Sequence, residues 1–268
     1  MSIRYEWNPS EYARHSEPQT RAAEELLARL DLKPDDVVID IGCGDGRHTA
    51  AIAARVPLGN VLGVDLSAEM IRFASEKFPQ RCYPNLCFEV GDATALRFVS
   101  EFSVVFSNLA LHWVVDHGPL LEGLVRALRP QGCLCMQMSE KGNYAAVLAA
   151  CNGLAQDRLW RSCFQDFSLE FAQYDADEYR ALLKRAGFIA DEVKMIEREI
   201  IYPNRQSFLG FWRNVAHPYT SRLLPEHRDL FLDQVADRYV EQHPLDANGQ
   251  ILVRAKRLFV LAHRPATA

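Results

Sequence analysis

The sequence has no excess of basic residues and no hydrophobic run long enough to cross a bilayer. It contains 30 Lys and Arg against 35 Asp and Glu, for a formal net charge of −5 and a pI near 5.9. Binding to a nucleic-acid backbone usually needs a basic surface, so we expect no nucleic-acid partner. The longest uncharged runs, 103–115 and 142–156, are shorter than the roughly 20 residues of a membrane-spanning helix, so we expect no membrane partner.

We also expect neither a secretory leader nor a disulfide framework. The opening residues, MSIRYEWNPSEYARHSEP, contain no apolar segment of the kind that directs secretion. The 7 cysteines are scattered, with no C-x-x-C pair and no histidines at zinc-finger spacing, so we expect buried free thiols and no metal site. These absences lead us to expect a cytoplasmic protein, while its oligomeric state, monomer or dimer, stays open.

The first two thirds of the chain alternate short apolar runs with amphipathic segments. Runs of strand length occupy 37–42, 61–66, 86–92, 103–111 and 133–138, and helices are predicted at 49–55, 67–78 and 119–128. Such alternation is typical of a mostly parallel sheet with helices on both faces. The sequence therefore predicts an α/β fold with a doubly wound, Rossmann-like sheet.

After residue 138 the alternation is less regular. Helices are predicted over 141–160 and from Asp175 to Gly187, where acids open the second helix and a glycine ends it. Strands are predicted at 193–202 and 250–262. The aromatic-rich helical segment between these strands, at about 203–249, is predicted to be an insertion that covers a substrate.

Three glycines in the segment VVIDIGCGDG directly follow the first predicted strand. In an open parallel sheet, ligands bind beyond the carboxyl ends of the strands. Gly42, Gly44 and Gly46 allow a positive φ and close approach of a ligand, and the next helix offers unpaired N–H groups. A dinucleotide and a nucleoside cofactor both suit such a turn, so the glycines alone do not choose between them.

Residues around the turn favour a nucleoside cofactor over a dinucleotide. The dinucleotide pattern G-x-G-x-x-G needs a third glycine, but Arg47 and Thr49 occupy the two possible positions. Asp40 lies just before the turn, where a carboxylate repels a phosphate but not a cationic ligand. Asp65 ends the second predicted strand 19 residues after Gly46, where it can accept hydrogen bonds from ribose hydroxyls of either cofactor class.

The segments VVIDIGCGDG, GVDLSAEMI, FEVGDATAL, FSNLALHWV and LRPQGCL resemble, in order and spacing, the motifs of class I S-adenosylmethionine-dependent methyltransferases. The resemblance spans 37–138 and departs from the family pattern at Ser103 and Gln131. It implies a seven-stranded sheet whose last strand is antiparallel. It also implies S-adenosylmethionine as cofactor, S-adenosylhomocysteine as product, and contacts from Asp40, Gly42, Cys43, Gly44, Gly46, Asp65, Leu66, Met70, Asp92, Ala93, Asn108 and Leu109.

On this basis the chain divides into three parts of one domain. Residues 1–36 are predicted to form entry helices, 37–140 the cofactor-binding core, and 141–268 a C-terminal half that contains the helical cover. Within the superfamily the chain is most similar to the branch of trans-aconitate, malonyl-carrier-protein and juvenile hormone acid methyltransferases, which esterify carboxylates. This similarity rests on SNLALHWVVDHGPLLEGLVRALRP, on the MQM strand and on EYARHSEPQTRAAEELL.

A carboxylate acceptor needs little chemistry from the protein. It is already ionised near pH 7 and attacks the sulfonium methyl without a strong general base. Catalysis then consists of aligning oxygen, methyl and sulfur and excluding water. By resemblance, the carboxylate is held by Gln19 and Trp113, with His112 beside them. From their residue types, Tyr5, Tyr12 and Trp212 are predicted to wall the substrate pocket and to favour the cationic methyl through their ring faces. Arg213 or His217 is predicted to attract an anionic substrate.

Three alternatives remain open from the sequence. A neutral amine, hydroxyl or carbon acceptor would need a base, for which His112, His217 or Tyr219 are candidates. A protein that binds the nucleoside without catalysis is a second alternative. An NAD-linked enzyme is a third.

Overall fold

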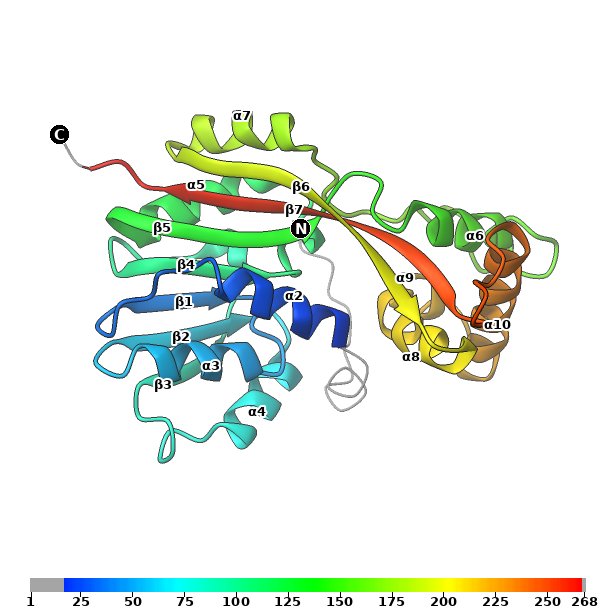
Figure 1. Cartoon of the computed structure of the whole chain (residues 1–268), viewed down its shortest axis with the longest axis horizontal. Helices are drawn as coiled ribbons and strands as arrows, with labels where there is room; N and C mark the ends of the chain where they lie inside the picture. Colours follow the sequence, from blue (N-terminus) through cyan, green and yellow to red (C-terminus); the bar gives the residue numbers. More distant parts are fainter. Residues whose placement is uncertain (1–16, 267–268) are drawn as a thin grey trace.

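The computed structural model describes residues 17–266 of the chain. Its strands form one seven-stranded sheet with the order β3-β2-β1-β4-β5-β7-β6 (Figure 1). The strands are β1 (Val37–Ile41), β2 (Asn60–Asp65), β3 (Leu86–Val90), β4 (Phe102–Asn108), β5 (Leu128–Ser139), β6 (Ile189–Tyr202) and β7 (Ile251–His263). Among these seven strands, β7 runs in one direction and the other six run in the opposite direction. The predicted mostly parallel, Rossmann-like sheet is therefore confirmed.

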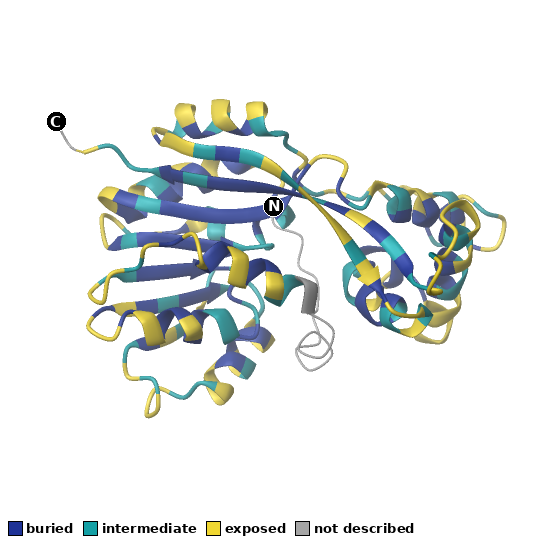
Figure 2. Ribbon diagram, in the orientation of Figure 1, coloured by how far each residue is buried: buried dark blue, intermediate teal, exposed yellow. Residues whose placement is uncertain are grey.

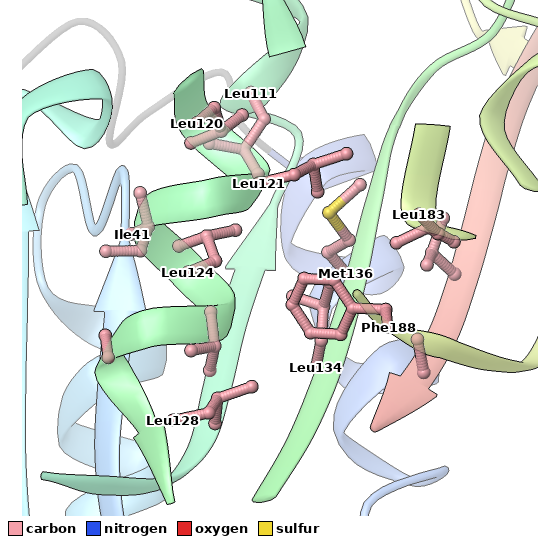
Figure 3. Packing of buried hydrophobic residues seen from close by; sticks show 14 of the residues in the cluster. Ile41, Leu111, Leu120, Leu121, Leu124, Leu128, Leu134, Met136, Leu183 and Phe188 are labelled. Atoms are coloured by element: carbon pink, nitrogen blue, oxygen red, sulfur yellow. The ribbon is translucent and has the colours of Figure 1, made fainter. Parts of the chain in front are cut away.

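Helices cover both faces of this sheet. α2 (Glu17–Leu27) and α3 (Arg47–Arg55) pack on one face, and α4 (Ala68–Lys77) lies beside β2 and β3. α5 (His117–Ala127) and α7 (Ala176–Ala186) pack on the other face. Figure 3 shows the core beneath these two helices, where Leu121 and Leu124 of α5 and Leu183 of α7 meet Met136 of β5.

The side chains of successive residues in a central strand pack alternately in the cores on the two faces of the sheet. In β1, Val38 belongs to the core beneath α2 and α3, whereas Ile39 and Ile41 belong to the core beneath α5. Because both faces are covered, the strand reads as a continuous apolar run rather than an alternating one. Asp40 is the exception, and Thr49 of α3 hydrogen-bonds its carboxylate on the first face.

The ends of α7 follow the prediction made from the sequence. Asp175 accepts hydrogen bonds from the backbone of Asp177 and Glu178, and the Glu178 carboxylate accepts one from the backbone N–H of Asp175. This capping box satisfies N–H groups that the first turn leaves without helical partners. Gly187 ends the helix with φ of 93°, a conformation that glycine adopts without strain.

A helical group, which we call the cap, lies beyond the end of the sheet (Figure 1). It consists of α6 (Ala145–Ala155), α8 (Arg205–Val215), α9 (His217–Thr220) and α10 (Pro225–Gln242). Its inward faces are buried (Figure 2) and form an aromatic core with Trp160, Phe164, Phe208 and Phe231. None of the helices formed by the described residues is long and apolar enough to span a membrane.

The strands β6 and β7 connect the sheet to the cap. They pair from Ile189 opposite His263 to Tyr202 opposite Ile251, with one register shift between Ala190 and Glu192, and extend much further than β1 or β2. At their far end, Tyr202, Ile251 and Val253 belong to the aromatic core of the cap. The helices α8 to α10 correspond to the predicted insertion at 203–249, and α6, from before this segment, packs with them.

Some predicted boundaries are wrong. β4 ends at Asn108 rather than at residue 111, because Leu109 takes a positive φ of 51° that breaks the extended chain. A short 3₁₀ turn from Leu111 to Trp113 follows. The helix predicted over 141–160 is confined to Ala145–Ala155.

Candidate active site

The carboxyl ends of four neighbouring parallel strands, β3, β2, β1 and β4, form one edge of the sheet. The register places Asp65 opposite Val90 and Ile41 opposite Val64. The strand ends are therefore level, and the segments that follow them lie side by side. The glycine turn follows β1, and Asp92 follows β3 by two residues.

The glycine turn is held against β2. The backbone N–H groups of Gly42 and Cys43 both donate to the carbonyl of Val64, at 2.7 and 3.1 Å. The φ angles of Gly42, Gly44 and Gly46 are 73°, 54° and 76°, so the predicted left-handed conformations are present. A Cβ on Gly42 would lie 2.1 Å from the Cβ of Ala110, so packing against the loop after β4 itself requires glycine there.

Asp65 connects the end of β2 to this turn. Its carboxylate accepts hydrogen bonds from the N–H of Gly44 at 3.0 Å and from the N–H of Ser67 at 2.9 Å. Burial raises the pKa of Asp65, and these two backbone donors oppose the increase. A carboxylate has about four acceptor positions, so Asp65 keeps capacity for ligand hydroxyls.

Asp40 is a buried acid beside the turn. Only 2% of its surface is exposed, and the hydroxyl of Thr49 donates to its carboxylate at 2.7 Å. Burial raises the pKa of Asp40 to about 7; the Thr49 hydrogen bond opposes the increase, and the charge of Asp65 adds to it. A cationic ligand nearby would favour the ionised form.

A cavity lies directly on the turn, and we call it the turn cavity. It encloses about 370 Å³ including space open to solvent. Its lining includes Gln19, Asp40, Gly42, Cys43, Gly44 and Asn108 from the predicted set. The other predicted cofactor residues, Gly46, Asp65, Leu66, Met70, Asp92, Ala93 and Leu109, do not line it.

Asp45 and Arg47 connect the start of α3 to α2 and α4 through hydrogen bonds and ion pairs. Both residues line the turn cavity. Burial alone would raise the pKa of Asp45, but hydrogen bonds from Arg47 and the charges of Arg47 and Lys77 lower it. The ion pairs measure 2.7 Å to Arg47 and 3.2 Å to Lys77. Arg47 also donates to Thr20 at 3.0 Å, which fixes α2 beside the turn.

A second cavity, which we call the cap cavity, lies between the sheet edge and the cap. It encloses about 810 Å³ including space open to solvent. Gln19, Leu109, His112 and Trp113 line it from the sheet edge, and Phe211, Asn214 and Val215 of α8 line it from the cap. Ser139, Asn143, Tyr144 and Arg257 are further lining residues. Gln19 lines both cavities, so the two spaces meet at its side chain.

Two residues that line the cap cavity carry buried polar atoms with no hydrogen-bond partner among the described residues: the Oε1 atom of Gln19 and the Nδ1 atom of His112. Buried polar atoms are nearly always partnered in native proteins, so these two atoms are candidates for contact with a ligand. Burial lowers the pKa of His112 to about 3, with a further contribution from His117. His112 is therefore neutral near pH 7 and a poor proton acceptor.

Sequence reasoning named Asn108 but missed Gln137, and these two amides together hold α2 over the sheet edge. The Nε2 group of Gln137 donates to the Oδ1 of Asn108 at 2.8 Å and to the carbonyl of Ala22 at 2.6 Å. The Nδ2 group of Asn108 donates to the carbonyl of Gln19 at 3.2 Å. The signal for this arrangement was a polar residue in the middle of the apolar MQM strand.

The 3₁₀ turn that carries His112 and Trp113 is held by His117, which the sequence did not identify either. Its Nε2 lies 3.0 Å from the carbonyl of Leu111, and its Nδ1 lies 2.9 Å from the hydroxyl of Tyr179. The tautomer that satisfies both contacts donates from Nε2 and accepts at Nδ1. Burial lowers the pKa of His117 to about 4, which favours this neutral form.

Several predicted substrate residues do not reach the cap cavity. Trp212 is fully buried in the aromatic core of the cap, with its ring 5.2 Å from Tyr144. Arg213 faces outward and pairs with Asp229 at 3.0 Å. Among the described residues, Trp212, Arg213 and His217 do not line the cap cavity. Phe211, Asn214 and Val215 of α8 line it instead. Tyr5 and Tyr12 lie outside the described residues.

Comparison with known proteins identifies the family. A family profile described as "Methyltransferase domain" matches residues 38–132. Trans-aconitate 2-methyltransferase of Escherichia coli is 32% identical over 263 residues, covering 97% of this chain and 98% of that protein. The chain belongs to the class I S-adenosylmethionine-dependent methyltransferases.

Solved structures agree with the methyltransferase fold. The YcgJ protein of Bacillus subtilis superposes with a TM-score of 0.65 at 17% identity, covering 92% of this chain and 100% of that one. Phosphoethanolamine N-methyltransferase 2 of Haemonchus contortus, solved with S-adenosylhomocysteine, gives 0.59 at 18% identity, covering 91% and 53%. At these identities the similarity concerns the fold alone.

The methyltransferase has residues at the turn that fit its methyl donor. The donor carries a cationic sulfonium next to a nucleoside, and the turn cavity contains the buried acid Asp40. Asp65, at the end of the neighbouring strand, keeps acceptor positions for hydroxyl groups. The unpartnered Oε1 of Gln19 offers a further acceptor at the same cavity.

The packing of the turn leads to a first prediction. We expect Gly42→Ala to destabilise the methyltransferase by about 3 kcal/mol or more, because a positive φ and a clash with Ala110 add together. Gly142→Ala is the matched control, because Gly142 has a similar φ of 81° but nothing within 4 Å of its Cβ position. It should cost about 1 kcal/mol. Urea unfolding followed by circular dichroism measures both, and equal costs would contradict this account of the turn.

Proposed function

We propose that the methyltransferase transfers a methyl group from S-adenosylmethionine to a carboxylate of a small molecule bound in the cap cavity. The observation that carries this proposal is that Gln19 lines both cavities. A donor in the turn cavity and an acceptor in the cap cavity would meet at this side chain. The E. coli relative, whose similarity extends over nearly the whole chain, is named for a carboxylic acid, trans-aconitate.

The residues along the sheet edge would hold the donor. When bound, S-adenosylmethionine supplies an electrophilic methyl group on sulfur. Asp65 would accept hydrogen bonds from the ribose hydroxyls, and Asp92 and Ala93 would contact the adenine. The glycine turn and Asp40 would hold the methionine part. Asn108, Leu109, Leu66 and Met70 are the remaining residues that we expect to contact the donor.

The acceptor is held by hydrogen-bond donors and needs no strong base. The amide N–H of Gln19 and the indole N–H of Trp113 donate to the carboxylate, which is already ionised near pH 7. His112 is neutral, and Tyr219 lies in the cap core, where its hydroxyl donates to Asn152 at 2.7 Å. Neither group therefore suits proton removal from a neutral acceptor. The contribution of the protein is to align the reacting atoms and to exclude water.

The donor site is tested with Asp65→Ala. Two lost hydrogen bonds to a charged acceptor should weaken binding of S-adenosylhomocysteine by about 100-fold or more in calorimetry. Asp36→Ala is the control, because Asp36 lies just before β1 at the opposite edge of the sheet. Unchanged affinity in Asp65→Ala would contradict the assignment of the ribose acid.

The acceptor site is tested with Trp113→Phe, which removes an indole N–H from the cap cavity. We expect kcat/KM for a carboxylic acid to fall by about 10- to 100-fold, because one hydrogen bond to a charged group is lost. Trp212→Phe removes an indole N–H that has no partner among the described residues, outside the cavity, and should leave activity unchanged. Gln19→Ala should behave like Trp113→Phe. Equal effects of Trp113→Phe and Trp212→Phe would argue against the proposed role of Trp113.

A carboxylate acceptor requires no titrating base, and this predicts the pH dependence of kcat. Because the folded-state pKa of His112 is lowered to about 3, this histidine stays neutral throughout the range above about pH 5. The acceptor carboxyl is ionised over the same range. We expect kcat at saturating donor to be flat from about pH 6 to about pH 9. Saturation matters because Asp40, with a pKa of about 7, affects donor binding. A rise or fall of kcat with pH near neutrality would indicate a titrating base and a neutral acceptor.

A further inference from the structure

Arg257 is the only charged residue among the described residues that line the cap cavity. It lies in β7, and only 6% of its surface is exposed. No aspartate or glutamate belongs to that described lining. A guanidinium stays protonated in proteins, so Arg257 contributes a positive charge to the described walls of the cavity.

The sheet determines where Arg257 points. In the antiparallel register between β5 and β7, Arg257 lies directly opposite Ser139, so the two side chains share a face. Gln137, two residues before Ser139, lies on the same face and donates to the carbonyl of Ala22 in α2. Arg257 and Ser139 therefore face the α2 side, where Gln19 lies.

Asn143 fixes the orientation of Ser139. Its Nδ2 group donates to the hydroxyl oxygen of Ser139 at 3.0 Å, and its Oδ1 accepts from the backbone N–H of Lys256 at 2.8 Å. Because Ser139 accepts this bond, its own hydroxyl hydrogen can be directed toward a ligand. Arg257 and Ser139 thus present a cation and a hydroxyl donor from adjacent strands.

Two charged residues that interact electrostatically with Arg257, Arg198 and Glu25, do not line the cap cavity. Arg198 of β6 pairs with Glu25 of α2 at 3.6 Å, and both of these side chains are largely exposed. Burial lowers the pKa of Arg257 and Arg198 adds to this, whereas Tyr144 and Glu25 oppose it. Arg198 is thus a nearby arginine that does not line the cavity.

We propose that Arg257, together with Ser139, binds a second carboxylate of the acceptor, so that the acceptor is a di- or polycarboxylic acid. The inference rests on the proposed function, which concerns only the carboxylate that receives the methyl group. Arg257 reaches the cavity from β7, whereas Trp113 reaches it from the turn after β4, so the two carboxylates occupy different walls. The planar fork of arginine matches a carboxylate in a bidentate contact, which selects for this group over a neutral one.

The test compares two acids and three variants. The acids are trans-aconitate, which has three carboxylates, and trans-2-butenoate, which has one. The variants are Arg257→Gln, Arg257→Lys and, as matched control, Arg198→Gln. KM and kcat are measured at saturating S-adenosylmethionine, and calorimetry gives the affinity for S-adenosylhomocysteine.

We expect Arg257→Gln to raise KM for trans-aconitate by about 10- to 100-fold and to change kcat little, because a charge-assisted contact is lost outside the reacting centre. KM for trans-2-butenoate should stay within about twofold, since this acid lacks the second carboxylate. Arg257→Lys keeps the positive charge but loses the planar guanidinium that makes a bidentate contact, so its increase in KM for trans-aconitate should be intermediate. Arg198→Gln should resemble the wild type, and all variants should keep their affinity for S-adenosylhomocysteine.

The outcomes separate this inference from the proposed function. If KM for both acids rises equally in Arg257→Gln, or does not change, the second subsite is wrong, while methylation of either acid still supports a carboxylate acceptor. If the wild type neither binds nor methylates either acid, both proposals fail. If Arg257→Gln does not fold by circular dichroism, Arg257→Lys carries the test, and an unchanged KM for trans-aconitate in that variant overturns the inference.

Discussion

The site depends on how the glycine turn is locked to β2. The amides of Gly42 and Cys43 share the carbonyl of Val64, and the amide of Gly44 donates to Asp65. Gly42 then packs so closely on Ala110 that a side chain there has no room. The loop after β4 is held in place by this contact, and with it the positions of Leu109, His112 and Trp113. One backbone turn thus helps to order the residues proposed to hold the donor and those proposed to hold the acceptor.

Amide side chains complete the arrangement. Asn108 and Gln137 hold the start of α2 against the sheet edge, and Gln19 on that helix stands between the turn cavity and the cap cavity. Desolvation keeps the buried histidines His112 and His117 neutral, so neither suits proton transfer near pH 7. The proposed carboxylate acceptor, which is ionised before it binds, would need no such transfer.

Much of the fold was predictable because its signals are local. The strand VVIDI, the acids that open α7 and the terminal Gly187 each depend on a few adjacent residues, and all appear as expected. The end of β4 was not predictable, since Leu109 takes its unusual φ from packing and hydrogen bonding around the turn. Trp212 and Arg213 were assigned to the substrate from their residue types, but one packs in the cap core and the other pairs with Asp229.

The sequence by itself determined the alternation of strands and helices, the glycine turn with its flanking acids, and the resemblance to methyltransferases, because these features are written in short spacings and in their order. Only the tertiary structure decided which side chains share a cavity. Gln19, Ser139 and Arg257 lie far apart in the chain, and their meeting depends on strand register and on the packing of α2. A charged residue inside an apolar strand does not show which face it occupies until its partner strand is known.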